Sequence, residues 1–366
     1  MAIYKQFNIV GAESPESSDV ITNVKDVVSS GMWADGAASL TSFFTSSVQS
    51  ASTATHYLDV YASDPATDAN AKPQFSVTYA HFFGSGSLGT KGTTGNRASA
   101  TMYRQLSQTL LGPNEDRFTF AGSGDHITPD YVYAISVARQ QLREKMDPGN
   151  WELHLSASGL SLGTMRGPIK LIDDSNSTTD AKVNQGGRVF NIVSGSIISG
   201  QSDVDTTATN QPGGAYGLFY PDLGILVFNG PILNASASLH HGSDANTAQL
   251  TTTTSNLEGG NVGKFFGAIT GSENTYFAAR REEVITSQHY FCRIPNKQFN
   301  FSSNPSFATS SDGSFTQPTF FKNPKTFITQ VGLYNDGGEL LAIAKLSKPL
   351  LKNYSREAII KVKLDF

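Results

Sequence analysis

Apolar and polar side chains alternate along much of this 366-residue chain, and the alternation predicts β-strands. Successive side chains of a strand point to opposite faces of a sheet, so a period of two is typical of a strand with one buried face. Short runs of aromatic and β-branched residues predict further strands. The predicted strands cover residues 57–61, 74–83, 117–120, 131–137, 151–156, 188–193, 276–279, 284–294, 298–301 and 358–366.

Two pairs of apolar segments flank turn sequences and predict β-hairpins. Residues 216–220 and 225–228 flank Pro-Asp-Leu-Gly, and residues 327–334 and 339–346 flank Asn-Asp-Gly-Gly. Asn, Asp and Gly tolerate the backbone conformations that tight turns need, and Pro presets one of them. We therefore expect both pairs to be antiparallel and adjacent in a sheet.

Helical spacing of apolar residues predicts three helices. Residues 19–30 carry four valines on one helical face and are followed by Gly31, a residue suited to end a helix. Residues 98–111 repeat methionine and leucine at helical spacing and precede a Gly-Pro pair. Residues 138–146 predict one or two further helical turns.

Together these elements predict an α+β fold that is predominantly β, with antiparallel sheets or a sandwich, a few short helices and long polar loops. We expect an N-terminal α+β domain at residues 1–165 and a loop-rich middle region with a β-hairpin at residues 166–265. A C-terminal antiparallel β domain would follow at residues 266–366. A chain of this length can form two or three domains and bury a sizeable core.

The low charge content narrows the classes of partner. Charged residues make up 16% of the chain, and the formal net charge is −4. An average domain has about 25% charged residues. We expect no nucleic-acid partner, because such binding needs a basic surface. The apolar runs are far shorter than the ~20 residues of a spanning helix, and the N-terminus lacks a secretion signal. We therefore expect a soluble protein without membrane insertion.

The charges that are present are unevenly distributed. Residues 1–80 hold three lysines and eight acidic residues, whereas residues 340–366 hold six basic and two acidic residues. Opposite poles of this kind could steer a second copy or another partner onto the chain. A solvated sheet face would account for the same charges, and both interpretations stay open at this point.

Few residues suggest catalytic or metal-binding chemistry. The glycines at residues 84–89 match a dinucleotide-binding spacing, but the helix that such a site needs does not follow directly, which favours a long loop. The pairs Asp125-His126 and His240-His241 are better explained as loop residues than as metal ligands. The acidic pair Glu282-Glu283 is typical of a charged strand edge that discourages aggregation.

The remaining candidates have simple structural explanations. The single cysteine, Cys292, excludes an internal disulfide and lies in an alternating stretch, where we expect a small buried side chain. His154 lies in a predicted strand and needs no role beyond packing and a hydrogen bond. We expect no catalytic residue, no metal site and no cofactor.

Three segments together resemble a known family. They are REKMDPGNWEL at residues 143–153, QFNFSSNPSF at residues 298–307, and the long run from Asn323 to Phe366. This pattern is similar to virion structural proteins of contractile-tailed, T-even-like bacteriophages, especially those that infect cyanobacteria. The resemblance spans most of the chain. It brings no catalytic residues to transfer.

The resemblance implies a non-enzymatic virion component, most simply in the tail or baseplate, as a wedge or peripheral part. Its partners would be other virion proteins, and the chain would form a homo-oligomer or a multi-copy assembly. It would be located in the virion, and in the host cytoplasm before assembly. We expect the inter-subunit contacts in four polar segments, namely residues 84–96, 173–187, 200–214 and 234–262.

Two alternatives remain open. The chain could be a neck, capsid-surface or fibre-attachment protein of the same particle. It could instead be a carbohydrate-binding β module, which would use exposed aromatic rings as stacking platforms. The candidate platforms are Trp33, Trp151, Tyr216 and Tyr220.

Overall fold

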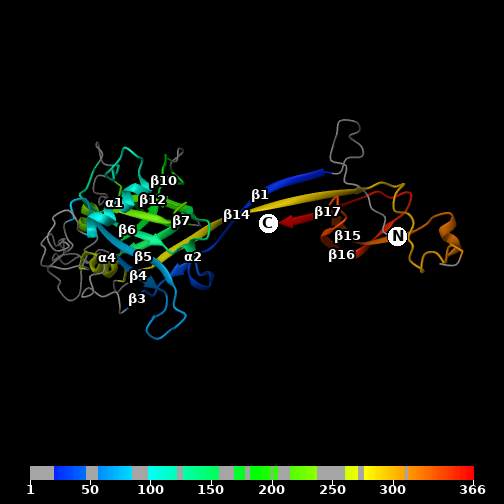
Figure 1. The fold of residues 1–366 in the computed structure, drawn as a ribbon, viewed down its shortest axis with the longest axis horizontal. Helices are drawn as coiled ribbons and strands as arrows, with labels where there is room; N and C mark the ends of the chain where they lie inside the picture. Colours follow the sequence, from blue (N-terminus) through cyan, green and yellow to red (C-terminus); the bar gives the residue numbers. More distant parts are fainter. Residues whose placement is uncertain are drawn as a thin grey trace. The chain divides into compact units, whose positions relative to one another are not determined.

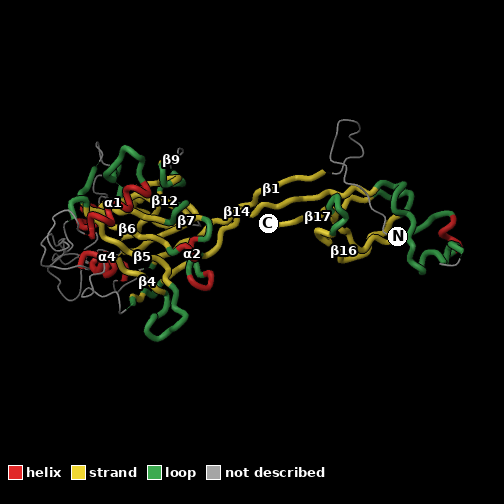
Figure 2. The backbone as a smooth tube through the Cα atoms, in the orientation of Figure 1, coloured by secondary structure: helices red, strands yellow, loops and turns green. Residues whose placement is uncertain are grey.

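The fold is known from a computed structural model, whose strands and helices confirm the predicted class. The chain is 51% strand and 15% helix, and the strand pairs among the described residues are antiparallel (Figure 1, Figure 2). The structure describes residues 20–46, 57–84, 98–121, 127–155, 169–177, 182–198, 201–204, 215–236, 260–270, 276–309 and 312–366.

The described residues contain four short α-helices and seventeen strands. The helices are α1 (Ala98–Leu110), α2 (Arg139–Leu142), α3 (Gly230–Ser236) and α4 (Gly260–Thr270). The first nine strands are β1 (Val20–Gly31), β2 (Ser39–Leu40), β3 (Phe44–Thr45), β4 (Tyr57–Tyr61), β5 (Pro73–His81), β6 (Tyr131–Val137), β7 (Lys145–Leu155), β8 (Ile169–Asp173) and β9 (Lys182–Asn184). The others are β10 (Gly187–Ile198), β11 (Gln201–Val204), β12 (Gly217–Tyr220), β13 (Ile225–Asn229), β14 (Phe277–Ile294), β15 (Thr326–Tyr334), β16 (Leu340–Lys352) and β17 (Ala358–Asp365).

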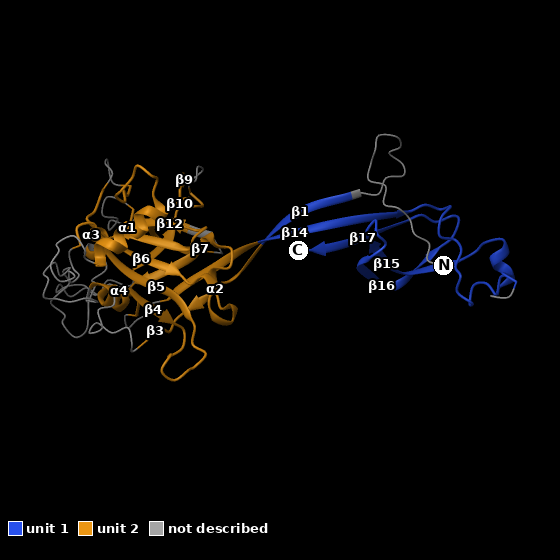
Figure 3. Ribbon diagram, viewed as in Figure 1, with its two compact units in different colours: residues 1–27, 284–366 blue, residues 28–283 orange. Residues whose placement is uncertain are grey.

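The chain forms two compact units, coloured separately in Figure 3. Unit 1 comprises residues 1–27 and 284–366, and unit 2 comprises residues 28–283. Strands β1 and β14 contribute residues to both units. These units differ from the three predicted regions, since the division expected between residues 265 and 266 falls within α4.

Unit 2 is a twisted antiparallel sheet with apolar cores on both faces. Its strand order is β14-β7-β8-β10-β12-β13-β6-β5-β4-β3. On one face, Val132 and Val227 pack in a cluster with Tyr103 of α1, while on the other their neighbours Tyr133 and Phe228 pack with α4. Alternate residues of β6 and β13 therefore serve opposite faces, as the pleat of a strand requires. Figure 1 shows these strands with α1 and α4 beside them.

Several elements of unit 2 confirm the sequence prediction closely. Strands β4 and β6 have the predicted bounds, and α1 begins at the predicted residue. Strands β12 and β13 pair from Gly217 with Phe228 to Tyr220 with Ile225, which is the predicted hairpin. Gly224 in its turn has φ of +65°, a conformation that favours glycine.

The predicted helix at residues 19–30 is wrong, because this segment is strand β1. β-Branched valines restrict helical side-chain rotamers, and the sheet supplies a pairing partner in β14. Gly31 does not end a helix. A Cβ added to it would lie 2.0 Å from the carbonyl oxygen of Gly36, so glycine is needed here for close backbone approach.

Other local predictions need smaller corrections. The helix expected at residues 138–146 is reduced to α2, because β7 already begins at Lys145. Residues 117–120 form only an isolated bridge through Phe120. The strands expected at residues 276–279 and 284–294 are one continuous strand, β14.

Unit 1 contains two antiparallel strand pairings. Residues 287–294 of β14 pair with β17, and β15 pairs with β16 as the predicted second hairpin. The apolar cluster of this unit has three buried side chains, Ile294, Ile360 and Val362, and its other members are only partly buried. Strand β17 confirms the predicted alternation, with Ile360 and Val362 buried and the adjacent lysines exposed.

Two predictions within unit 1 are wrong. Residues 298–301 are not a strand, because Phe299 has φ of 58° and the Asn300 side chain donates to the carbonyl oxygen of Asn296. Both features belong to a turn. Cys292 is half-buried and not fully buried as expected, and it lies opposite Ile360 in the pairing of β14 with β17.

Candidate functional site

The four aromatic residues predicted as carbohydrate platforms are all buried, so this prediction is wrong for each of them. Trp33 donates its indole N–H to the carbonyl oxygen of Phe277 at 2.7 Å, and its ring packs on the ring of Phe277. Trp151 packs on Phe219 in the same core. None of the four can offer a ring face to a sugar, and the four residues are Trp33, Trp151, Tyr216 and Tyr220.

Several other predicted candidates lie outside the described residues. These are Asp125-His126, His240-His241 and the glycine-rich segment after Gly84. Most of three predicted contact loops, residues 84–96, 200–214 and 234–262, also lies there, whereas most of residues 173–187 is described and includes β9. Their roles stay predictions. Among the described residues, no group of three or more His, Cys, Asp or Glu side chains could hold a metal ion.

The acidic pair Glu282-Glu283 does not occupy a sheet edge. Strand β14 lies between β1 and β7, and Glu282 pairs across the ladder with Lys145. The Lys145 Nζ lies 2.7 Å from Glu282 Oε1, and the Arg143 Nη1 lies 2.9 Å from Glu283 Oε1. These carboxylates therefore form ion pairs inside the sheet, and the predicted edge function is wrong.

A buried cluster of titratable side chains joins three strand regions of unit 2. Glu152 and His154 occupy alternate positions of β7 and are both 4% exposed. Their side chains hydrogen-bond through Glu152 Oε1 and His154 Nε2. Tyr276 donates its hydroxyl to the same carboxylate oxygen at 3.0 Å, and the backbone N–H of Ile197 donates to Oε2 at 2.8 Å.

The pKa values in this cluster follow from those contacts. Burial alone would raise the pKa of Glu152, but the hydrogen bonds from His154, Ile197 and Tyr276 stabilise the carboxylate and lower it. Burial and the adjacent carboxylate raise the pKa of Tyr276 to about 12. An ionised Glu152 with three donors is the favoured state at neutral pH.

The hydrogen bonds of this cluster connect separate strands, which is a structural role. Each oxygen of Glu152 accepts a hydrogen bond, and the His154 ring lies 3.9 Å from the Tyr276 ring, centroid to centroid. With the side chains of Glu152 and His154 almost fully buried, the cluster ties β7 to the backbone of β10 and to the residue before β14. His154 thus has the packing and hydrogen-bonding role that its strand position predicted.

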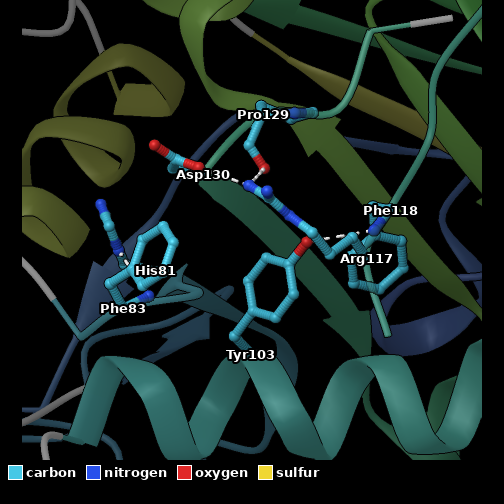
Figure 4. A network of polar contacts seen from close by, with 7 residues as sticks. All are labelled: His81, Phe83, Tyr103, Arg117, Phe118, Pro129 and Asp130. Carbon is cyan, nitrogen blue, oxygen red and sulfur yellow. Dashed lines mark hydrogen bonds and ion pairs between the residues drawn. The ribbon is translucent and has the colours of Figure 1, made fainter. Parts of the chain in front are cut away.

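A second polar network fixes the chain around Arg117 and is drawn in Figure 4. Arg117 forms an ion pair with Asp130 and donates to the carbonyl oxygen of Pro129, and its guanidinium lies 4.7 Å from the centre of the Phe82 ring. Tyr103 of α1 accepts a hydrogen bond from the Phe118 N–H at 3.0 Å. The network anchors these segments to the sheet and to α1.

His81 completes the same region. Its Nδ1 accepts the backbone N–H of Phe83 at 3.0 Å (Figure 4). Its ring stacks on Tyr131 with an interplanar angle of 9°. Burial is the main influence on the nearby Tyr103 and raises the pKa of its hydroxyl. The contacts of His81, Tyr103 and Arg117 thus fix the backbone of the segments next to β5, α1 and β6.

Unit 1 has a different kind of site, an apolar surface on the β15–β16 hairpin. One side of the hairpin packs half-buried aliphatic residues against the core of the unit. The other side exposes four large apolar side chains, which we call the hairpin face. The hairpin face consists of Tyr334, Leu340, Leu341 and Ile343.

The geometry of the hairpin makes this face continuous. Gly332 pairs with Ile343, and a Cβ on Gly332 would lie 2.9 Å from Cε2 of the Tyr334 ring, so the ring covers the glycine. A register shift next to Tyr334 leaves both Leu340 and Leu341 exposed. Soluble monomers rarely leave contiguous apolar side chains uncovered unless the surface binds something.

The described residues contain no helix long and apolar enough to cross a membrane. Comparisons with known protein families, with curated proteins and with solved structures found no match to this chain. Arguments about function therefore rest on the residues themselves.

Neither the Glu152 cluster nor the hairpin face was predicted from the sequence. Glu152 and His154 were visible as a Glu-x-His spacing in a predicted strand, but their partner Tyr276 is 124 residues from Glu152 in sequence. The hairpin itself was predicted, whereas the face that it leaves exposed depends on which side packs on β14 and β17.

Proposed function

We propose that this chain is a non-enzymatic structural component of a contractile-tailed phage virion that acts through protein–protein interfaces. Its placement in the tail or baseplate follows from the same sequence resemblance. In this proposal the partners are other virion proteins and further copies of the chain. The virion is its site of action, and the host cytoplasm is where it resides before assembly.

The observation that carries the proposal is the incomplete burial of unit 1. Two of the three segments that resemble virion proteins, residues 298–307 and 323–366, lie in this unit. The same unit exposes the hairpin face and further large side chains such as Phe321 and Ile359. An assembly protein needs apolar surface of this kind, because burying it drives association.

The burial of the predicted aromatic platforms favours assembly over carbohydrate binding. A sugar-binding module needs exposed rings, and the candidates for that role support the core of unit 2 instead. The buried Glu152 cluster is likewise explained by its hydrogen bonds to the backbone and to neighbouring side chains. Within the particle, a neck, capsid-surface or fibre-attachment location is the alternative to the tail.

Mass spectrometry of purified particles tests the proposal. Particles of the phage that encodes the chain would be banded by density, and their heads and tails would then be separated. We expect peptides of this chain in intact particles and in the tail fraction, at a constant ratio to the tail-tube protein. Recovery only in the head fraction would overturn the tail placement. Recovery only in the unassembled lysate would overturn the virion function.

A further inference from the structure

Unit 1 buries a lysine whose hydrogen bonds all go to uncharged groups. Lys352 is 0% exposed, and its Nζ donates at 2.9–3.0 Å to the carbonyl oxygens of Asn296 and Asn353 and to Oδ1 of Asn300. Among the residues that the structure describes, Lys352 belongs to no ion pair. Burial lowers the pKa of its ammonium group, and the negative charge of Glu357 offsets this only in part. A larger fraction of this amine is therefore neutral, and hence nucleophilic, than in an exposed lysine.

The side-chain amide of Asn300 lies directly against this amine. Asn300 is 7% exposed, and its Nδ2 donates to the carbonyl oxygen of Asn296 at 2.7 Å, which fixes the orientation of the amide. The Lys352 Nζ lies 2.9 Å from Oδ1 of this amide, and a C=O bond is about 1.2 Å long, so Nζ is at most about 4.1 Å from Cγ. Reacting atoms need to approach to about 3–3.5 Å. A short movement of the flexible lysine side chain closes this gap.

We propose that Lys352 and Asn300 join in an intramolecular isopeptide bond between Nζ and Cγ. The reaction is an amide exchange. The neutral Nζ attacks Cγ, the Nζ–Cγ bond forms, and the Cγ–Nδ2 bond breaks. One proton of Nζ is transferred to Nδ2, which leaves as ammonia, so the reaction needs no oxidant or other co-reactant. Glu357 is the carboxylate whose charge acts on Lys352, and in this proposal it carries that proton from Nζ to Nδ2.

The bond would link the turn after β14 to the last residue of β16. It would close a loop from Asn300 to Lys352 and, like a disulfide, would restrict the unfolded chain. Unit 1 is the unit that gains most from such a link, because its apolar cluster has only three buried side chains. A disulfide cannot take this role within the chain, since Cys292 is its only cysteine.

Mass spectrometry of the purified full chain tests the bond directly. We expect the denatured native chain to be lighter than its sequence by the mass of one ammonia molecule. Trypsin does not cleave after an acylated lysine, so a digest should contain one branched species. In it, residues 298–322 would be joined to residues 346–356, and fragmentation should place the link between Asn300 and Lys352. The unlinked peptides 298–322 and 346–352 should be nearly absent.

Single substitutions separate the two reacting groups from their surroundings. Lys352→Arg keeps a buried cation with hydrogen-bond donors but has no amine to acylate, and Asn300→Ala removes the amide. Both variants should have the full mass of their sequences. Asn304→Ala is the matched control, because Asn304 is exposed and lies in the same tryptic peptide, and it should still lose ammonia. Glu357→Gln should lower the cross-linked fraction of freshly purified protein, and circular dichroism should show the native fold in each variant.

The native chain alone can overturn the proposal, whatever the variants do. A full sequence mass after prolonged incubation, with unlinked peptides in the digest, would show that the bond does not form. An ammonia loss that persists in Lys352→Arg would arise at another residue and would also refute it. An unchanged cross-linked fraction in Glu357→Gln would overturn the role of Glu357 in proton transfer. Because the virion function is tested separately in purified particles, an unlinked chain that is found in tails would refute the cross-link alone.

Discussion

Unit 2 is packed around fully buried aromatic rings, whereas unit 1 has a thin apolar cluster. In unit 2, Phe75 lies 5.5 Å from Phe277 and 5.8 Å from Trp33, centroid to centroid, and all three are at most 1% exposed. In unit 1, Ile360 and Val362 are buried, but the residues around them are only partly buried.

The two units also use polar groups differently. The buried cluster of unit 2 lies in a sheet that already has two apolar cores. In unit 1, Lys352 is fully buried, and its Nζ donates to the carbonyl oxygens of Asn296 and Asn353 and to Oδ1 of Asn300, at 2.9–3.0 Å. This ammonium group links the end of β16 to the turn after β14. In unit 1 a buried lysine therefore holds two segments together by hydrogen bonds.

The largest expected effect comes from truncating the aromatic core of unit 2. Phe75→Ala should lower the free energy of unfolding of unit 2 by about 3–5 kcal/mol, because it removes a buried ring and leaves a cavity. Both tryptophans of the chain, Trp33 and Trp151, lie in this unit, so tryptophan fluorescence during urea unfolding reports on it alone.

Leu346→Ala is the matched truncation in unit 1. Leu346 is partly buried, and we expect a loss of only about 1 kcal/mol, since less apolar area leaves water in the folded state. Hydrogen exchange of peptides from residues 326–366 measures it. Equal losses of unfolding free energy for the two variants would mean that the apolar clusters of the two units contribute alike, against the expected contrast.

The strands and turns of both units were largely predictable, because their patterns are local. Residues 131–137 are a short run of aromatic and β-branched residues that gives the bounds of β6, and Asn335 to Gly338 mark the turn of the second hairpin. The valines of β1 led to a wrong helix prediction, since their spacing of three and four residues imitates that of a helix. In the structure Val27 and Val28 are exposed, so this spacing does not mark a buried helical face.

Other features depend on contacts that no local pattern records. Helix α4 was missed because Gly260, Gly263 and Gly267 have low helix propensity, yet it packs Phe265 fully into the sheet. The Glu152 cluster forms only because β7 pairs with β14 and brings Tyr276 to the carboxylate. The exposure of the hairpin face likewise follows from packing within unit 1.

The effect expected from Lys352 is smaller than that of Phe75→Ala. It tests the contribution of buried hydrogen bonds to unit 1. Lys352→Met keeps most of the side-chain volume but removes a donor to three oxygens, which remain in a buried region. We expect a loss of about 2–3 kcal/mol for unit 1, more than for Leu346→Ala, measured by the same hydrogen exchange. Lys325→Met is the control, because Lys325 is exposed in the same unit. If Leu346→Ala proved the more damaging change, packing would dominate in both units.

The effect expected from Glu152 is also small, and it depends on pH. Glu152→Gln retains an acceptor for His154 and Tyr276 but turns an amide donor toward the N–H of Ile197, so unit 2 should lose about 1–2 kcal/mol at neutral pH. The folded-state pKa of Glu152 lies below its ordinary value of 4.5, so ionisation stabilises the fold above that pH. This stabilisation disappears as the pH falls through the folded-state pKa.

The native chain should therefore approach the stability of Glu152→Gln in acid, as measured by tryptophan fluorescence during urea unfolding between pH 3 and pH 7. Glu115→Gln, an exposed carboxylate of the same unit, should show no such convergence. A constant difference across this range would mean that Glu152 contributes through its shape and not through its charge. The Glu152 cluster would then stabilise unit 2 by packing, as its apolar core does.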